Sequence, residues 1–368
     1  MQVLWLLKGL GPGGAERVVL LSARHRHRGE VEGVVAHLLA HKDHLSGAVE
    51  AEGVAVRCLG GRRGLDPRWL WRLRSLMVAS GTDVVHAHAP VPAVGARLVA
   101  RTIRRSARPA LVVTYHSLWS SRARLTNLAD AATAPLDDAR FAVSEAVRRS
   151  LPSAIGRRCE VVLHGVDAPE VRAAAVGARD EVRAELGIGP DEVVVVTAAN
   201  LRAPKAYPDL LAAAALAIAR EPRLRFVTLG QGPLAEEIAA RHRRSGLGDR
   251  FLLLGYRDDA VRVAAAADLA CLPSVAEGFP LALVEAAVLG LPTVATAVGG
   301  IPEVVADGTT GVLVAPGDPE ALADALVALA ADPDRRATMG AAAAVRGQEL
   351  SIAAAVARYE ARYRELVA

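Results

Sequence analysis

Short apolar runs, mostly β-branched, alternate along this chain with longer amphipathic runs, and this alternation constrains the fold more than any other feature. The runs VLWLL and ALVVTYH are nearly continuously apolar, as expected for strands covered on both faces. Strands that alternate with helices predict an α/β fold with doubly wound parallel sheets. The expected strands are residues 3–7, 31–39, 83–88, 110–116, 140–144, 159–165, 192–200, 225–230, 250–255, 267–274, 291–296 and 310–316.

The strand pattern lapses once, in a stretch rich in alanine, arginine and glutamate after residue 165. Because 368 residues exceed one domain of average size, we interpret the lapse as a domain boundary. The expected parts are an N-terminal Rossmann-like domain over 1–167, a linker over 168–190, a second Rossmann-like domain over 191–350, and a C-terminal helix over 351–368 that packs back on the N-terminal domain.

The positive charge of this chain is spread out. The formal net charge is +4 and the pI is near 9.2, and arginine supplies nearly all of the positive charge, because Lys8, Lys42 and Lys205 are the only lysines. A nucleic-acid binder concentrates basic residues on one element. These arginines are scattered through expected helices, so we expect no nucleic-acid partner.

Cysteine usage and hydropathy bear on the compartment. Cys58, Cys159 and Cys271 are far apart, and their spacing fits neither a disulfide framework nor a metal site. No apolar run approaches the roughly 20 residues of a spanning helix, and the N-terminal apolar run is shorter than the core of a signal peptide. We therefore expect a cytoplasmic protein in a reducing compartment.

Two glutamates in the stretch PSVAEGFPLALVEAAVLGLPTVAT, residues 273–296, carry the most chemical information. Glu277 lies in a loop bounded by glycine and proline, and Glu285 lies in the apolar helix that follows. A carboxylate accepts hydrogen bonds from two neighbouring hydroxyls, so two separated carboxylates suit a ligand with a polyol at each end. A nucleotide sugar, with ribose at one end and hexose at the other, is such a ligand.

Further candidates follow strands, where ligands bind in doubly wound folds. Gly13 and Gly14 precede a helix N-terminus, which favours anions, although a simple tight turn is the alternative. Arg202 and Lys205 lie where cationic side chains could stabilise a departing diphosphate, although solvated loop charges are the alternative. Further turns that contain glycines allow the backbone to approach a ligand closely, and they lie at residues 229–234, 254–260, 296–305 and 307–318.

The histidines and one D-x-D sequence bear on metal binding. His86 and His88 leave one expected strand, His116 leaves another and His164 a third. Because no third ligand follows at a recognisable spacing, a hydrogen bond from one histidine to a sugar hydroxyl is favoured over a metal site. Asp332 begins a helix, so we interpret it as an N-cap and not as a magnesium ligand.

Taken together, the motifs resemble those of the retaining glycosyltransferases of family 4. They occur over nearly the whole chain in the order GGAE, DVVHAH, TYH, VSEAVRRSL, HGVD, NLRAPK, GQGPL, LGY, AEGFPLALVEA, LPTVAT, GGIPEVV and TGVLV. The resemblance implies the GT-B fold, two Rossmann-like domains facing across a cleft, in a bacterial enzyme of carbohydrate biosynthesis. It also implies metal-independent, retaining transfer from a nucleotide-diphosphate sugar, in the first place a UDP-sugar, to a hydroxyl of a small-molecule, saccharide or lipid-linked acceptor.

The resemblance also implies a role for each matching residue. Glu285 would hold the ribose hydroxyls, Glu277 the donor sugar hydroxyls, and Lys205 with Arg202 the diphosphate. His116 would contact the sugar near the reacting carbon, so His116, Lys205 and Glu277 are the expected catalytic residues. The expected donor-binding residues are Gly13, Gly14, Asn200, Arg202, Lys205, Gly255, Tyr256, Glu277, Gly278, Phe279, Pro280, Leu281 and Glu285, and no metal or other cofactor is expected.

Three positions depart from the family pattern. Asn200 stands where many members have arginine, Ala206 where they have glycine, and His164 where asparagine is common. Either Arg202 supplies the missing charge or the diphosphate is held by less charge. Asn200 and Ala206 keep an inactive sugar-nucleotide-binding protein as an alternative. A nucleotide-sugar epimerase on the same two-domain plan, which would bind the same donor, is a second alternative.

The acceptor is expected to meet the N-terminal half. Residues 57–77 interleave arginines with Trp69 and Trp71. This pattern fits either peripheral contact with an anionic inner membrane face or a helix that covers the sheet while its arginines reach solvent. Residues 117–128, directly after His116, are a candidate acceptor loop.

Overall fold

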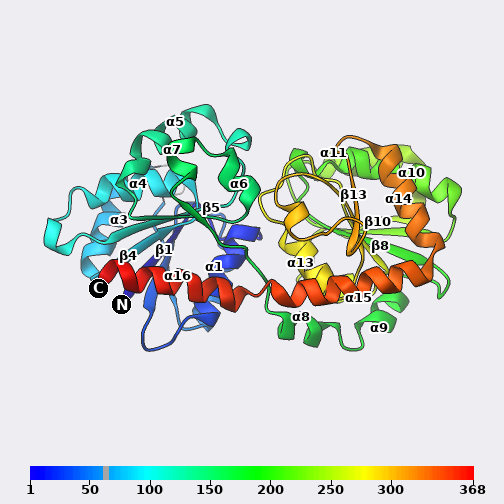
Figure 1. Ribbon diagram of the computed structural model, residues 1–368, viewed down its shortest axis with the longest axis horizontal. Helices are drawn as coiled ribbons and strands as arrows, with labels where there is room; N and C mark the ends of the chain where they lie inside the picture. The colour runs from blue at the N-terminus through cyan, green and yellow to red at the C-terminus, as the bar shows by residue number, and fades with distance from the viewer. Residues whose placement is uncertain (61–65) are drawn as a thin grey trace. The chain divides into compact units, whose positions relative to one another are not determined.

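In a computed structural model, which describes residues 1–60 and 66–368, the chain divides into two compact units. The first unit comprises Met1–His164 together with Ile352–Ala368, and the second comprises Gly165–Ser351 (Figure 1). Each unit is built on one parallel sheet with helices around it, as the alternation of strands and helices predicts.

The sheet of the first unit has seven strands in the order β3-β2-β1-β4-β5-β6-β7. The expected strands are all present, and β3 is an additional one. β3 is an edge strand whose Arg57 and Cys58 are exposed, so its sequence lacks the apolar run that marks the others. The strands are β1 (Gln2–Leu7), β2 (Glu32–His37), β3 (Ala55–Cys58), β4 (Val84–Ala87), β5 (Ala110–Tyr115), β6 (Ala139–Ala142) and β7 (Cys159–Val161).

At least one helix of this unit begins at a side-chain N-cap that its sequence predicts. Ser144, for example, caps α6 by accepting a hydrogen bond from the backbone N–H of Val147. The helices are α1 (Gly14–His25), α2 (Ser46–Ala51), α3 (Arg68–Ala79), α4 (Pro90–Ala100), α5 (Arg124–Thr133), α6 (Glu145–Ser150), α7 (Ser153–Gly156) and α16 (Ile352–Val367), with 3-10 turns η1 (Arg105–Ala107), η2 (Trp119–Ser121) and η3 (Ala134–Leu136).

Helix α3 belongs to the core of the first unit. Its Trp69 is buried with Leu4 and Leu6 of β1, and a Cβ on Gly95 of α4 would lie 1.9 Å from the Trp69 ring. Trp69 therefore behaves as part of a sheet-covering helix, whereas Trp71 is 70% exposed. Of the stretch 57–77, residues 61–65 lie outside the described residues.

The second unit has a six-stranded sheet of order β10-β9-β8-β11-β12-β13, and every expected strand is present. Its strands are β8 (Val193–Ala198), β9 (Leu224–Leu229), β10 (Phe251–Leu253), β11 (Leu269–Leu272), β12 (Thr293–Thr296) and β13 (Gly311–Val314). Its helices are α8 (Ala168–Ala175), α9 (Ala178–Glu185), α10 (Tyr207–Arg220), α11 (Ala235–Ser245), α12 (Ala260–Ala265), α13 (Leu281–Val288), α14 (Pro319–Ala331) and α15 (Pro333–Glu349), with 3-10 turns η4 (Ala203–Lys205), η5 (Gly248–Arg250) and η6 (Ile301–Glu303).

The connecting segments are more structured than a linker. Residues 168–190, assigned to a linker from the sequence, contain α8 and α9, and both pack on α12 within the second unit. At the other end, α16 follows α15 along the chain but packs on α1 in the first unit. Asp332 caps α15 through its carboxylate, which accepts from the backbone N–H of Arg335 at 2.9 Å.

Across the described residues, none of the helices combines the length and the apolar character needed to span a bilayer.

Candidate functional site

The order of strands in the second sheet locates a candidate site. The chain runs from β8 outward to β9 on one side, and β11 lies on the other side of β8. In a doubly wound sheet, the loops at such a reversal diverge and leave a crevice at the carboxyl ends of the two strands. The loop after β8 carries Asn200, Arg202 and Lys205, and the loop after β11 carries Glu277.

An ion pair joins these two loops. The ammonium group of Lys205 contacts Oε2 of Glu277, and the two side chains are only 22% and 12% exposed. The hydroxyl of buried Ser274 lies 3.4 Å from the same carboxylate oxygen. The site therefore presents one cation and one carboxylate, both largely shielded from solvent, at the edge where a ligand is expected.

Backbone contacts brace this pair. The N–H of Val275 donates to the carbonyl of Pro204 at 2.8 Å, which ties the β11 loop to the β8 loop. Gly299 has a φ of +54°, and a Cβ there would lie 1.7 Å from the carbonyl oxygen of Glu277. A glycine is thus required at 299 for the backbone of Glu277 to lie where it does.

The turn into α10 has an unusual backbone. Among the described residues, Ala206 is the one non-glycine residue with positive φ, at 48° with ψ of 45°. This left-handed conformation costs a residue with a Cβ about 1 kcal/mol or more, and glycine relieves that cost. The alanine that departs from the family pattern therefore takes a conformation that glycine adopts readily, and Lys205 ends the 3-10 turn η4 two residues before α10 begins.

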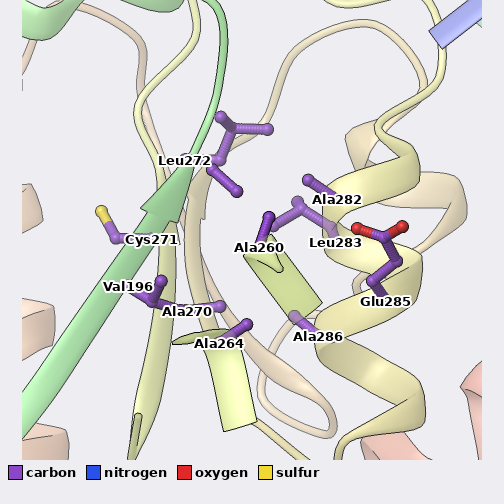
Figure 2. Close-up of a pocket in the computed structure, with 11 residues that line it drawn as sticks. Val196, Ala260, Ala264, Ala270, Cys271, Leu272, Ala282, Leu283, Glu285 and Ala286 are labelled. Carbon is purple, nitrogen blue, oxygen red and sulfur yellow. The ribbon is translucent and has the colours of Figure 1, made fainter. Parts of the chain in front are cut away.

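Glu285 lies in the helix that follows the Glu277 loop. It projects from α13, near a cavity of about 20 Å³, which is room for about one water. Figure 2 shows Glu285 with the small residues around this cavity: Ala260 and Ala264 of α12, Ala270 of β11, and Ala282 and Ala286 of α13. Glu285 is the one charged residue of the otherwise apolar α13, and its side chain lines this cavity beside β11.

The remaining expected donor-binding residues lie in the same unit. Gly255 and Tyr256 follow β10, where Tyr256 is 44% exposed, and Gly255 has a φ of +71°. Gly255 also lines an apolar pocket of about 180 Å³ with Leu201 and Gly230. Residues 278–281 form the turn into α13: Phe279, Pro280 and Leu281 are buried, and Gly278 is partly exposed.

In the first unit, Gly13 and Gly14 begin α1, as expected. Gly13 is the N-cap residue, and a Cβ on it would lie 2.2 Å from Oε2 of Glu16. The carboxylate of Glu16 thus folds back on the first turn of α1, where a negative charge is stabilised by the helix dipole. Any anion bound at this turn would have to share it with Glu16.

His116 directly follows β5 and is partly exposed. Its Nε2 lies 3.0 Å from Nδ1 of His88, which follows β4. Burial lowers the pKa of His116 to about 3, and the ring is therefore neutral at physiological pH. A neutral imidazole can donate or accept a hydrogen bond to a sugar hydroxyl.

The structure thus brings Lys205, Glu277 and Glu285 to one edge of the second sheet, and His116 and Gly13 to the carboxyl edge of the first. Sequence reasoning missed Ser274 and the fit of Gly299 against Glu277. The glycine pair at 299 and 300 was a signal for close approach, but its partner could not be read from spacing. Within the described residues, no group of three or more His, Cys, Asp or Glu is arranged to hold a metal ion.

Comparison with known families accounts for most of the chain. Residues 12–169 match the family described as Glycosyltransferase Family 4, and residues 192–332 match the family described as Glycosyl transferases group 1. The chain belongs to the glycosyltransferases that these two families describe. The first match covers β2 to β7 and the second covers every strand of the second sheet, and together they include every expected site residue.

Curated relatives of this family member match about half of it. A D-inositol 3-phosphate glycosyltransferase of Kribbella flavida is 37% identical over 202 residues, which are 52% of this chain and 47% of the relative. An N-acetyl-alpha-D-glucosaminyl L-malate synthase of Bacillus anthracis is 34% identical over 160 residues, which are 44% of this chain and 42% of the relative. The chain thus spans about half the length of the curated relatives it matches.

Solved structures establish the GT-B fold for this glycosyltransferase family member. HepE of Anabaena, solved in complex with UDP-glucose, has a TM-score of 0.86 and 22% identity, and the match covers 98% of this chain and 100% of that one. A sucrose-phosphate synthase of Thermosynechococcus elongatus has a TM-score of 0.83 and 20% identity, covering 100% and 99%. At these identities the likeness concerns the fold alone.

Proposed function

We propose that this protein is a retaining, metal-independent glycosyltransferase that moves a sugar from a nucleotide-diphosphate donor, a UDP-sugar in the first place, to a hydroxyl of a small-molecule, saccharide or lipid-linked acceptor. The observation that carries the proposal is the Lys205–Glu277 ion pair at the reversal of the second sheet, with Glu285 on the next helix. Family membership and the UDP-glucose bound to HepE support it.

The two partners of the ion pair would each contact one part of the donor. A diphosphate brought to the crevice competes for the ammonium group of Lys205, aided by exposed Arg202. The carboxylate of Glu277 is then released to accept from sugar hydroxyls, and that of Glu285 from the ribose hydroxyls. Three charged side chains would in this way recognise the three parts of a sugar nucleotide.

The proposed chemistry needs few groups. The bond between the anomeric carbon and the phosphate oxygen breaks, the acceptor oxygen bonds to the same face of that carbon, and the leaving phosphate takes the acceptor proton. Lys205 stabilises the charge that grows on the leaving diphosphate, and His116 holds a sugar hydroxyl. Positioning of the reactants supplies much of the remaining rate.

The compartment and any membrane contact are also part of this proposal. Cys58, Cys159 and Cys271 are free thiols, which supports a reducing cytoplasm. Trp71, 70% exposed on the arginine-rich helix α3, supports peripheral contact with the inner membrane face, while buried Trp69 anchors that helix to the core. A vesicle flotation assay with anionic and neutral lipids tests the contact.

The donor is tested by thermal shift with UDP-, GDP-, TDP- and ADP-glucose in EDTA, because a ligand of the folded state raises its apparent stability. We expect stabilisation by UDP-glucose, and the absence of any shift contradicts the proposal. Incubation with the donor alone separates the epimerase, which would isomerise the sugar nucleotide. D-inositol 3-phosphate and L-malate, which occur in the names of two relatives, are the first acceptors to test.

A further inference from the structure

Four histidine rings form a row inside the first unit. The ring centroids lie 4.0 Å apart for His86 and His88, 5.3 Å for His88 and His116, and 5.2 Å for His116 and His164. His86 belongs to β4, His88 follows β4, His116 follows β5 and His164 follows β7. Three of the four are buried, and His116 alone reaches the surface.

Both ends of this histidine row are hydrogen-bonded to one helix. The hydroxyl of Tyr363 lies 2.5 Å from Nδ1 of His86, and the hydroxyl of Tyr359 lies 2.6 Å from Nε2 of His164. Tyr359 and Tyr363 are one turn apart on α16 and therefore share a face of that helix. Helix α16 thus holds the first and the last ring of the row, and the two middle rings lie between them.

The protons in these hydrogen bonds follow from the charge state of the rings. Burial lowers the pKa of His86 and keeps the ring neutral, so one of its nitrogens donates and the other accepts. With Tyr363 as the donor, Nδ1 of His86 is the acceptor. The remaining proton of His86 is on Nε2, which lies 2.7 Å from the hydroxyl of Thr114.

The far end of the row has the same arrangement. Tyr359 can donate to Nε2 of His164. Burial also lowers the pKa of His164, so its single ring proton is on Nδ1. Each tyrosine hydroxyl can therefore fix the tautomer of the end ring that it contacts.

The His164 end of the row also lies where the chain passes between the two units. His164 is the last residue before the second unit begins, and α16 starts directly after that unit ends. Within the second unit, Val166 bridges to Ser351, and a Cβ on Gly165 would lie 2.0 Å from the carbonyl oxygen of Leu350. The Tyr359–His164 hydrogen bond therefore joins the segment by which the chain leaves the first unit to the helix by which it returns.

We propose that Tyr359 and Tyr363 are positioning residues that clamp the histidine row and thereby hold the ring of His116 in place. His116 is fixed on one side by the hydrogen bond to His88 and on the other by the ring of His164. Neither tyrosine touches the donor; both act through the rings between them. The proposal rests on the proposed function for the role of His116, but the clamp itself is a statement about ring geometry.

The test compares Tyr359→Phe, Tyr363→Phe and the double variant with wild type, because each change removes only a hydroxyl. Two-bond ¹H–¹⁵N spectra of the histidine rings, assigned with His116→Gln, report the tautomer and order of His116. We expect its resonances to shift or broaden in the variants. With UDP-glucose as donor, kcat should fall about tenfold to a hundredfold, as for a small misplacement of a reacting group, while KM for UDP-glucose changes little.

Tyr115→Phe is the matched control, since Tyr115 is also buried and its hydroxyl has no hydrogen-bond partner among the described residues. Unchanged His116 resonances in the double variant overturn the clamp, as does an equal loss of kcat in Tyr115→Phe. If wild type shows no transfer from UDP-glucose, the proposed function fails while the spectra still decide the clamp. If the His116 resonances change and kcat does not, the clamp holds the ring of His116 but does not serve catalysis, and the positioning role is wrong.

Discussion

Lys205 and Glu277 form an ion pair although they lie 72 positions apart along the chain. They meet because β8 and β11 are neighbours in the sheet, and each residue lies in the loop that follows its strand. Opposite charges are thus held together at the point where the strand order reverses. A donor with a diphosphate and a sugar can exchange this pair for one contact to each charge.

The two carboxylates should separate binding from turnover. Glu285→Gln removes the charged acceptor expected at the ribose, so UDP should bind about tenfold to a hundredfold more weakly, as expected for loss of a charged hydrogen bond. Glu277→Gln should not weaken UDP binding, because UDP lacks the sugar and the change removes the carboxylate that competes for Lys205, and it should lower kcat for UDP-glucose. Calorimetric titration of UDP and initial rates with UDP-glucose measure the two effects.

Glu236→Gln is the control for both changes, because Glu236 is exposed on the first turn of α11 in the same unit. Glu236→Gln should change neither the affinity for UDP nor kcat with UDP-glucose. If Glu277→Gln weakened UDP as much as Glu285→Gln, the assignment of sugar and ribose to these two carboxylates would be incorrect.

Ala206→Gly tests the strain at the turn before α10. Relief of the left-handed conformation and loss of the buried methyl group nearly offset each other, so the free energy of unfolding should stay unchanged or rise by up to about 1 kcal/mol. Ala213→Gly, at a buried position inside α10, should instead lower it by about 1 kcal/mol or more. Urea denaturation compares the two, and an equal loss in both would show that Ala206 is not strained.

The histidine row should make the first unit sensitive to acid. Burial lowers the pKa of all four histidines, to about 3 for His116, whereas in the unfolded chain they protonate near pH 6.5. The unfolded state therefore binds more protons below about pH 6.5, and stability falls as the pH falls, by about 1.4 kcal/mol per pH unit for each histidine. Stability should be highest above pH 6.5, where all four are neutral in both states.

Denaturation between pH 7 and pH 5 measures this slope. His164→Asn removes one buried histidine and should reduce the slope by up to about 1.4 kcal/mol per pH unit. His44→Gln, at an exposed position, should leave the slope unchanged. A slope that is the same in wild type and His164→Asn would contradict neutral burial of the row.

Much of the fold could be predicted from the sequence, because buried parallel strands leave continuous apolar runs. The edge strand β3 escaped prediction because solvent contact replaces that run with AVRC. Residues 168–190 were assigned to a linker because α8 and α9 are rich in alanine and charge, yet they pack on α12. Neither feature leaves a local signal, since both depend on what the segment packs against.

The candidate site was predictable where one residue carries one chemical property. Lys205, Glu277 and Glu285 stand out by charge in apolar or glycine-rich surroundings. The fit of Gly299 against Glu277 and the row of His86, His88, His116 and His164 depend on contacts between distant strands. Spacing along the chain does not encode such contacts. The sequence therefore indicated the histidines as candidates but not Tyr359 and Tyr363, which are hydrogen-bonded to them.

The most direct test of the donor site is calorimetric titration of UDP-glucose, in EDTA, into wild type and Lys205→Ala. Arg220→Ala is the control, because it removes an exposed ion pair with Asp324 in the same unit. We predict binding by wild type and by Arg220→Ala, and affinity at least about tenfold lower in Lys205→Ala, as for loss of a charge-assisted contact to phosphate. Equal affinity in wild type and Lys205→Ala, or no binding by wild type, would contradict the account.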